Sequence, residues 1–336
     1  GIYEEARRGW LYPLDMNPEG TKAFKNGQWN KYRVEAIGNH IKTWINDIPC
    51  ANLRDEETAM GHFGLQVHSV GDNKDKEGIE VRWRNVRIIT ENPDQHTKET
   101  TAPEMNRLKN ELTEKQKADG WKLLFDGKTT EGWRGAHKDS FPAFGWKIHD
   151  GILTVVESGG GEAEHGGDIV TMDEYSAFDF RLEFLLTDSA NSGIKYFVTE
   201  KEEPSGSAHG LEFQILDDKG HPDAKKFTTF EGSRTVGSLY DLIPAKNKRV
   251  AGIGLWNHAR VVVYPDNKVE HWLNGIKVLE YVRGSEEFRE KVAQSKYAAD
   301  KYNEHGRFGE AEKGHILLQD HGDRVSFKSI KIKELK

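Results

Sequence analysis

The stretch Gly314-His315-Ile316-Leu317-Leu318-Gln319-Asp320-His321-Gly322 decides the fold. It reads as a β-strand that begins with apolar side chains and ends with polar, titratable ones. A related stretch lies far upstream, Gly61-His62-Phe63-Gly64-Leu65-Gln66-Val67-His68. Both contain Gly-His, then apolar residues, then Gln-x-His. The repetition indicates the domain plan, and the polar end is the first candidate for chemistry.

Short alternating runs occur through most of the chain, and alternation is typical of strands because successive side chains point to opposite faces. Residues 32–37 and 40–46 flank Gly38-Asn39, which is a β-hairpin pattern. Closely spaced strands with few helices predict an all-β sandwich or jelly roll. In the C-terminal two thirds the expected strands are 121–125, 146–148, 152–156, 178–184, 193–198, 211–216, 259–264, 269–273, 315–319 and 325–332.

The two related stretches belong to a longer internal repeat. The matched segments keep their order with short gaps, which indicates a duplication. In the first copy, the apolar pattern itself predicts strands at 63–67 and 79–88, and the break in alternation indicates a bulge near Asn85. The matched pairs are Ile2-Tyr3 with Leu239-Tyr240, Trp29-Asn30 with Trp256-Asn257, Arg33-Val34 with Arg260-Val261, Trp44-Ile45-Asn46 with Trp272-Leu273-Asn274, and Val81, Trp83, Val86 and Ile88 with Val325, Phe327, Ile330 and Ile332.

This repeat predicts two jelly-roll domains. Residues 1–89 are expected to form the C-terminal part of a first domain, and residues 120–336 a complete second one. The first copy has no counterpart of residues 121–236. Because half a sandwich exposes an apolar sheet face, we expect the absent strands to have been removed or to lie in another chain. The alternative is that the second domain completes the first sheet.

Two segments depart from the strand pattern. Residues 90–119 are expected to be a linker with a short helix at about 104–119, where Thr113 and Gln116 form a capping box. The charged segment at about 285–305 is expected to contain a short helix and a long loop. Insertions of this kind in a sandwich often border a functional cleft.

Composition excludes several classes of protein. The net charge of −7, with basic residues dispersed among acidic ones, argues against a nucleic-acid partner. No apolar run approaches the roughly 20 residues of a transmembrane helix. With Cys50 as the only cysteine, an internal disulfide cannot form. Nine tryptophans suit sugar binding, although each one is more simply explained as core filler.

Several expected strands carry isolated polar side chains among apolar neighbours. If these side chains share one sheet face, they form a polar cleft floor suited to acid–base chemistry. The simpler interpretation is the ordinary solvated face of an antiparallel sheet. The sequence contains no phosphate loop, dinucleotide fingerprint, nucleophile elbow or spaced metal motif. A metal site from Glu212, Asp320 and His321 is only weakly indicated. The candidates are Lys195, Glu212, Gln214, His271, Gln319 and His321.

The chain resembles the 3-keto-disaccharide hydrolase domain family. The resemblance extends over nearly all of residues 110–335, and residues 1–89 resemble the back part of a second copy. It implies a concanavalin A-like jelly-roll sandwich. The motifs that carry it include Asn191-Ser192-Gly193-Ile194-Lys195-Tyr196, Glu212-Phe213-Gln214-Ile215-Leu216-Asp217-Asp218, Ser238-Leu239-Tyr240-Asp241, His271-Trp272-Leu273-Asn274-Gly275, Ser295-Lys296-Tyr297 and Leu318-Gln319-Asp320-His321-Gly322.

The resemblance also implies a reaction. Family members are described as cleaving glycosides that carry a ketone at C3, where a base removes the C2 proton, the glycosidic oxygen leaves and water adds. By position, Glu212, His271 and His321 are the implied acid–base groups, and Lys195 is implied either to polarise the ketone or to fix a hydroxyl. Residues implied to orient the sugar are Gln214, Tyr240, Lys296, Gln319 and Asp320.

The first copy departs from this pattern, because Thr43 matches His271 and Val67 matches Asp320. It is therefore expected to be inactive, sugar-binding or differently specific. The alternatives for the whole chain are a non-catalytic carbohydrate-binding module and a scaffold domain in a cell-surface complex. No cofactor is evident in the sequence, and a divalent cation is the one candidate left open. The resemblance implies a location in the periplasm or at the cell surface.

Overall fold

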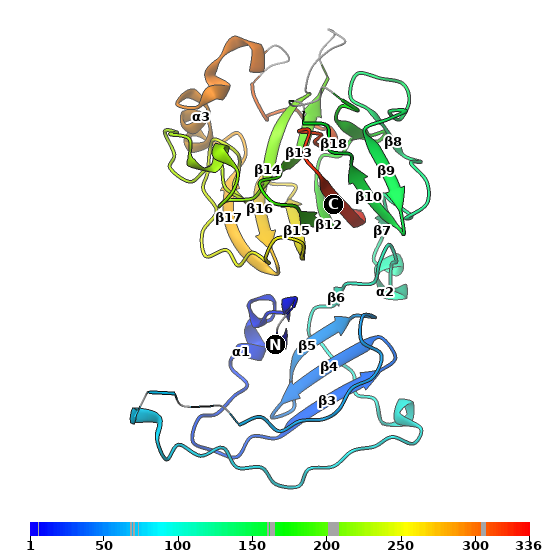
Figure 1. The fold of residues 1–336 in the computed structure, drawn as a ribbon, viewed down its shortest axis with the longest axis vertical. Coiled ribbons are helices and arrows are strands. Elements are labelled where there is room, and N and C mark those ends of the chain that lie inside the picture. Colours follow the sequence, from blue (N-terminus) through cyan, green and yellow to red (C-terminus); the bar gives the residue numbers. More distant parts are fainter. Residues whose placement is uncertain are drawn as a thin grey trace.

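The structure is a computed structural model of the 336-residue chain. It describes residues 1–5, 7–67, 69, 71–72, 74–159, 161, 165–200, 208–303 and 307–336. His68, one of the residues matched in the repeat, lies outside the described residues. Figure 1 shows a β-sandwich above a smaller sheet.

The C-terminal region, residues 120–336, is a sandwich of two antiparallel sheets. The eight-stranded sheet has the order β17-β16-β15-β12-β19-β10-β9, with β7 also pairing with β19. The five-stranded sheet has the order β14-β13-β18-β11-β8. The all-β jelly-roll prediction is therefore confirmed. The strands are β7 (Trp121–Leu123), β8 (Trp133–Gly135), β9 (Trp146–His149), β10 (Ile152–Val155), β11 (Ile169–Thr171), β12 (Phe178–Leu186), β13 (Asn191–Thr199), β14 (His209–Leu216), β15 (Trp256–Val263), β16 (Lys268–Leu273), β17 (Ile276–Val282), β18 (His315–Leu318) and β19 (Val325–Glu334).

The core of the sandwich follows from alternation along the strands. In β13, Ile194 and Tyr196 point into the core, while Lys195 points to the opposite face. In β14, Phe213 points into the core and its neighbour Glu212 points away. The five-stranded sheet thus buries one face against the other sheet and presents polar groups on its outer face.

Helices are short and lie outside the sandwich. The predicted capping box is confirmed at α2 (Glu114–Ala118), where Gln116 N–H bonds the Thr113 hydroxyl and the Gln116 side chain accepts the Thr113 N–H. The remaining helical segments are η1 (Leu14–Met16), α1 (Pro18–Thr21), η2 (Lys74–Lys76), η3 (Pro93–His96), η4 (Pro222–Lys225), α3 (Glu286–Ala293), η5 (Lys296–Ala298) and η6 (Asp300–Tyr302). Among the described residues, every helix is too short or too polar to span a bilayer.

The N-terminal part contains two small sheets. β1 (Ile2–Glu4) pairs with β2 (Gly9–Tyr12), and a second sheet has the order β3-β4-β5-β6. Its strands are β3 (Tyr32–Ile37), β4 (His40–Ile45), β5 (Ile48–Arg54) and β6 (Met105–Asn106). The hairpin predicted around Gly38-Asn39 is confirmed. The expectation of a helix over 104–119 is only partly right, because Met105–Asn106 adds a parallel strand to β5.

The hairpins β3–β4 and β15–β16 share an asparagine network, as a duplication predicts. Asn46 bonds Asn30 through its amide nitrogen, and Asn274 bonds Asn257 in the same way, both at 2.8 Å. Both Asn46 and Asn274 have φ of 51°. Each also accepts the N–H of the residue that follows its partner asparagine. The same local sequence therefore gives the same local structure in both regions.

The predicted strands at 63–67 and 79–88 are wrong. The described residues of these segments form no regular strand, and their apolar side chains are exposed. Phe63 is 82% exposed and Trp83 is 52% exposed. Within the described chain, no strand lies beside them to satisfy their backbone groups. The four-stranded sheet does not join either sheet of the sandwich, so the second region does not complete it.

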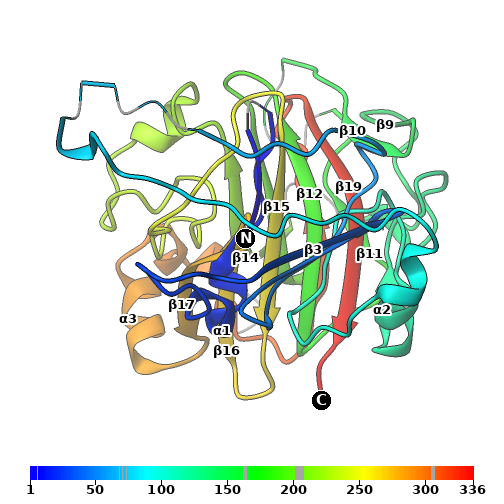
Figure 2. The ribbon, with the colours of Figure 1, turned by 90° about the horizontal axis from the view of Figure 1, so that it is seen from below.

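The segment that joins the two regions packs beneath the eight-stranded sheet (Figure 2). Arg107 lies 3.6 Å from the Glu183 carboxylate of β12, and both side chains are buried. Asn110 accepts the Ser329 N–H at 2.7 Å. Residues after 104 are therefore bound to the sandwich, in contrast to a free linker.

Candidate active site

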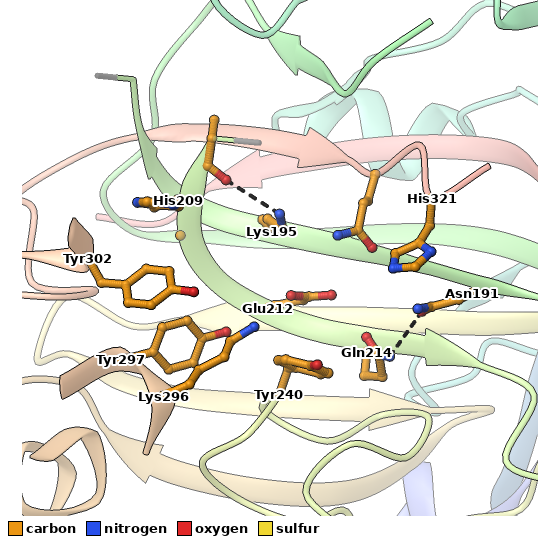
Figure 3. A pocket seen from close by; sticks show the side chains of 13 residues that line it. Asn191, Lys195, His209, Glu212, Gln214, Tyr240, Lys296, Tyr297, Tyr302 and His321 are labelled. Atoms are coloured by element: carbon orange, nitrogen blue, oxygen red, sulfur yellow. Dashed lines mark hydrogen bonds between the residues drawn. The ribbon is translucent and has the colours of Figure 1, made fainter. Parts of the chain in front are cut away.

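A pocket of about 100 Å³ opens on the outer face of the five-stranded sheet (Figure 3). Its floor comes from β13, β14 and the end of β18, and its wall from the segment after Val236 and the insertion after α3. The expectation that the insertion borders a cleft is confirmed. The lining residues are Asn191, Lys195, Ala208, His209, Gly210, Glu212, Gln214, Tyr240, Lys296, Tyr297, Tyr302, Gln319 and His321.

Glu212 lies in the middle of this group of side chains (Figure 3). It is 6% exposed, so its carboxylate is largely removed from water. A Cβ on Gly193 would lie 2.3 Å from its Oε1 atom, which shows that the carboxylate rests directly on the β13 backbone. A partly desolvated carboxylate in a cleft is well placed to act as a base.

Lys195 is the cross-strand neighbour of Glu212. Its ammonium donates to the Ala208 carbonyl at 3.4 Å and lies 3.9 Å from a carboxylate oxygen of Asp168. Asp168 is 2% exposed, so this pair is held away from solvent. A fixed cation beside a carboxylate can stabilise negative charge that develops on a bound substrate.

Gln214 gives the pocket an unused hydrogen-bonding atom. Its Nε2 donates to Asn191 Oδ1 at 3.1 Å, which fixes the amide. Its Oε1 is buried and has no hydrogen-bond partner among the described residues. A buried acceptor without a partner costs free energy, so a ligand hydroxyl that donates to it is favoured.

Aromatic rings form the opposite wall. Tyr240 donates its hydroxyl to Asp223 at 2.8 Å, and the Lys296 ammonium lies 4.2 Å from the Tyr240 ring centre. Burial, assisted by the charge of Glu212, raises the pKa of both Tyr240 and Tyr297. These phenols therefore stay protonated at neutral pH and do not serve as bases.

His321 reaches the pocket from the end of β18. Its ring centre lies 6.0 Å from that of His221, and the two rings are perpendicular. His221, His321 and Asp323 each offer one ligand atom within 4.8 Å of the others. Burial, followed by the charge of His321, lowers the pKa of His221.

His271 does not reach the pocket. It belongs to β16 in the opposite sheet and is completely buried. Its ring bonds the Tyr196 hydroxyl at 2.8 Å and the Gly237 carbonyl at 3.0 Å. Burial lowers its pKa to about 4. The expectation that His271 shares one sheet face with Glu212 is wrong, so we do not keep it as an acid–base candidate.

Asp320 also points away from the pocket. One carboxylate oxygen accepts the N–H groups of Gly166 and Gly167, and the other accepts that of Gly322. These bonds bind the loop before β11 to the end of β18. The structure gives Asp320 a positioning role and does not place it where it could contact a sugar. It does not lie with Glu212 in a metal site either.

The family comparison covers most of the chain. A family model described as the 3-keto-alpha-glucoside-1,2-lyase-like domain matches residues 1–89 and 120–333. The chain belongs to this family.

Proteins similar to this 3-keto-alpha-glucoside-1,2-lyase-like chain include one curated protein and two solved structures. A protein of Bacteroides thetaiotaomicron named 3-keto-disaccharide hydrolase is 36% identical over 290 residues, which are 81% of this chain and 95% of that protein. A solved structure from Parabacteroides distasonis, described as a candidate glycosyl hydrolase, is 31% identical with a TM-score of 0.57 and covers 68% of this chain and all of that one. A second structure from that organism, described likewise, is 27% identical with a TM-score of 0.45 and covers 64% and 99%.

Sequence reasoning found most of the pocket of this lyase-like chain. The structure brings together Lys195, Glu212, Gln214, Tyr240, Lys296, Gln319 and His321. It adds Asn191, His209, Tyr297 and Tyr302, which the sequence prediction missed. Asn191 precedes Gly193 on the same face of β13, so alternation could have found it. The rings of Tyr297 and Tyr302 come from the insertion, where no periodicity exists to predict their direction.

Proposed function

We propose that this protein cleaves glycosides that carry a ketone at C3 of the sugar, by elimination across C1 and C2 followed by addition of water. By family membership the chain is a carbohydrate-active glycoside hydrolase. The substrate class comes from the relative named 3-keto-disaccharide hydrolase. The mechanism is argued from the pocket.

One observation carries the proposal: Glu212 is the only carboxylate among the described residues that line the pocket. Glycoside hydrolysis by direct displacement ordinarily uses two carboxylates on either side of the scissile bond. Elimination needs one base, because the ketone makes the C2 proton acidic. A single carboxylate with a buried ammonium beside it suits the second reaction better.

In the proposed reaction Glu212 takes the C2 proton, and the electron pair of that C–H bond moves toward the C3 carbonyl oxygen. Lys195 stabilises the resulting oxyanion, assisted by His321. The electron pair then expels the C1 oxygen, which receives a proton from Glu212. Water adds across the C1–C2 double bond, with hydroxyl at C1 and a proton at C2. The sum is hydrolysis.

Gln214, Gln319, Tyr240 and Lys296 are proposed to orient the sugar. The free Oε1 of Gln214 accepts a sugar hydroxyl, and the ring of Tyr240 offers an apolar wall to one sugar face. Glu212 and Lys195 then act on a sugar whose position is fixed.

The test uses Glu212→Gln, with Glu231→Gln as the matched control because Glu231 is exposed outside the pocket. On a 3-keto-glucoside we expect Glu212→Gln to lower kcat by about 10²–10⁴-fold and the control to have no effect. In D₂O, mass spectrometry of the product should show one deuterium at C2. Full activity of Glu212→Gln, or cleavage without deuterium at C2, contradicts the proposal. Binding of unoxidised glycans without any turnover identifies a binding module instead.

We also propose that the N-terminal region is a non-catalytic partial copy. Residues 1–89 contain no counterpart of Lys195, Glu212 and Gln214, because they match the other region only from Leu239 onward, and the described apolar residues of 60–89 are exposed. Strands equivalent to residues 121–236, supplied by a partner chain, would cover them. We place the protein in the periplasm or at the cell surface.

A further inference from the structure

Two imidazoles and a carboxylate converge at the His321 end of the pocket. His221, His321 and Asp323 each bring one ligand atom within 4.8 Å of the other two. Within the described part of the chain, no hydrogen bond joins any two of them. Their convergence is therefore not explained by bonds among themselves.

Neighbouring groups hold two of these side chains in place. One Asp323 oxygen accepts the Asn191 N–H at 2.9 Å. The His221 ring accepts the Asp223 N–H at Nδ1, at 3.1 Å. Asn191 is fixed in turn by Gln214. The Asp323 contact is of the kind that orients the ligands of metal sites. The Asp223 N–H instead occupies the Nδ1 lone pair of His221, and a cation bound at that nitrogen must displace it.

We propose that His221, His321 and Asp323 bind a divalent transition-metal ion. Two imidazoles and one carboxylate suit Zn²⁺, Mn²⁺ or Co²⁺, whereas Ca²⁺ and Mg²⁺ prefer sites made of oxygen alone. The Asp223 N–H competes with a cation for the His221 ring. We therefore expect dissociation constants of about micromolar order, weaker than those of closed structural zinc sites.

The site gives the cation a role in the proposed reaction, and this part rests on the proposed function. His321 lines the pocket, so three protein ligands leave coordination positions open toward a bound sugar. A cation there would accept the C3 carbonyl oxygen as a ligand and draw electron density from it. The C2 proton becomes more acidic, and Glu212 removes it. His321 thus acts on the ketone through the metal.

Binding is tested on the full chain after dialysis against a chelator. Mn²⁺ titration followed by electron paramagnetic resonance, and Zn²⁺ titration by calorimetry, should each show one ion per chain. His321→Ala, His221→Gln and Asp323→Asn should weaken binding at least about tenfold. His149→Gln is the control, because His149 is exposed and lies outside the pocket. Thermal unfolding without metal identifies variants that fail to fold, and Asp323→Asn is the mildest change.

The inference is overturned if no ion binds, or if binding persists unchanged in folded His321→Ala and Asp323→Asn proteins. Activity separates this result from failure of the proposed function. Suppose the chelated protein turns over a 3-keto-glucoside at the full rate while Glu212→Gln does not. The proposed elimination is then supported, and the proposed catalytic role of the metal is rejected. If Mn²⁺ binds at these residues but the wild-type protein does not act on the keto-sugar with or without metal, the metal site is supported and the proposed function is rejected.

Discussion

Residues 81–88 and 325–332 carry the same apolar pattern but lie in opposite surroundings. Val325, Phe327, Ile330 and Ile332 are 0% exposed, whereas their counterparts Val81, Trp83, Val86 and Ile88 are 52–72% exposed. The backbone nevertheless bends at the same position, because Asn85 has φ of 54° and Ser329 has φ of 55°. The bend is therefore local, and burial depends on neighbouring strands.

The neighbours account for the difference. β19 lies between β12 and β10, which satisfy its backbone groups, and its apolar side chains enter the core of the sandwich. No strand of the described chain lies beside residues 79–89. The hairpins β3–β4 and β15–β16, by contrast, form in both regions. In each hairpin the two strands pair with each other, and the same asparagine network is present. A strand pattern predicts conformation, but the partner determines its stability.

The largest expected difference in the free energy of unfolding is between Phe327→Ala and Trp83→Ala. Phe327→Ala should lower the free energy of unfolding of the sandwich by about 3–5 kcal/mol, because it opens a cavity in a closed core. Trp83→Ala should change it by less than about 0.5 kcal/mol, since the side chain is half exposed. Urea denaturation followed by circular dichroism measures both. Equal losses would show that residues 79–89 pack as tightly as β19.

Replacing His271 by its counterpart in the N-terminal region tests whether that histidine is structural. His271→Thr should cost about 2–4 kcal/mol, because it removes a buried ring and its bonds to Tyr196 and Gly237. During turnover in D₂O, the product of this variant should still carry one deuterium at C2. Urea denaturation at pH 7.5 and deuterium incorporation during turnover are the measurements. A variant of wild-type stability that has lost turnover would restore His271 as a catalytic candidate.

His271→Thr should also change how the free energy of unfolding depends on pH. The folded-state pKa of His271 is about 4 and the unfolded value about 6.5, so only the unfolded state binds this proton between those values. The wild-type protein should lose stability as pH falls from 6.5 toward 4, by on the order of 3 kcal/mol from this group. The difference between wild type and His271→Thr should therefore narrow over this range. Parallel pH curves would contradict the assignment.

The smallest expected effect is one that the two regions share. Asn46→Ala and Asn274→Ala each remove a bond to a neighbouring asparagine and one to a backbone N–H. Each should cost about 1–2 kcal/mol locally. Hydrogen exchange at the Lys31 and His258 amides, which donate to these asparagines, should become about 5–30-fold faster in the matching variant. An effect in one region only would show that the two networks are not equivalent.

Local and alternating features could be predicted from the sequence. The hairpin at Gly38-Asn39 and the capping box at Thr113 depend on neighbours in the chain, and both are present. Alternation on β13 and β14 placed Lys195, Glu212 and Gln214 on one face, and the structure brings them into one pocket.

Features that depend on distant packing could not be predicted. His271 lies between apolar neighbours on its strand, as Lys195 does. Its strand belongs to the opposite sheet, however, and there the side chain points into the core. Asp320 follows an apolar strand, yet its carboxylate accepts hydrogen bonds from the N–H groups of a loop more than 150 residues upstream. His221 comes to His321 only through folding of the segment after β14.

The contact between Gly193 and the Glu212 carboxylate has a stereochemical consequence. Since the carboxylate rests on the backbone of β13, it can meet a sugar only from the side of the sheet. In the proposed reaction the sugar must then lie with its C2 hydrogen facing the sheet. A sugar epimeric at C2 presents its hydroxyl there instead. In the proposed reaction, the absence of a side chain at residue 193 would thus let the protein distinguish one face of its substrate from the other.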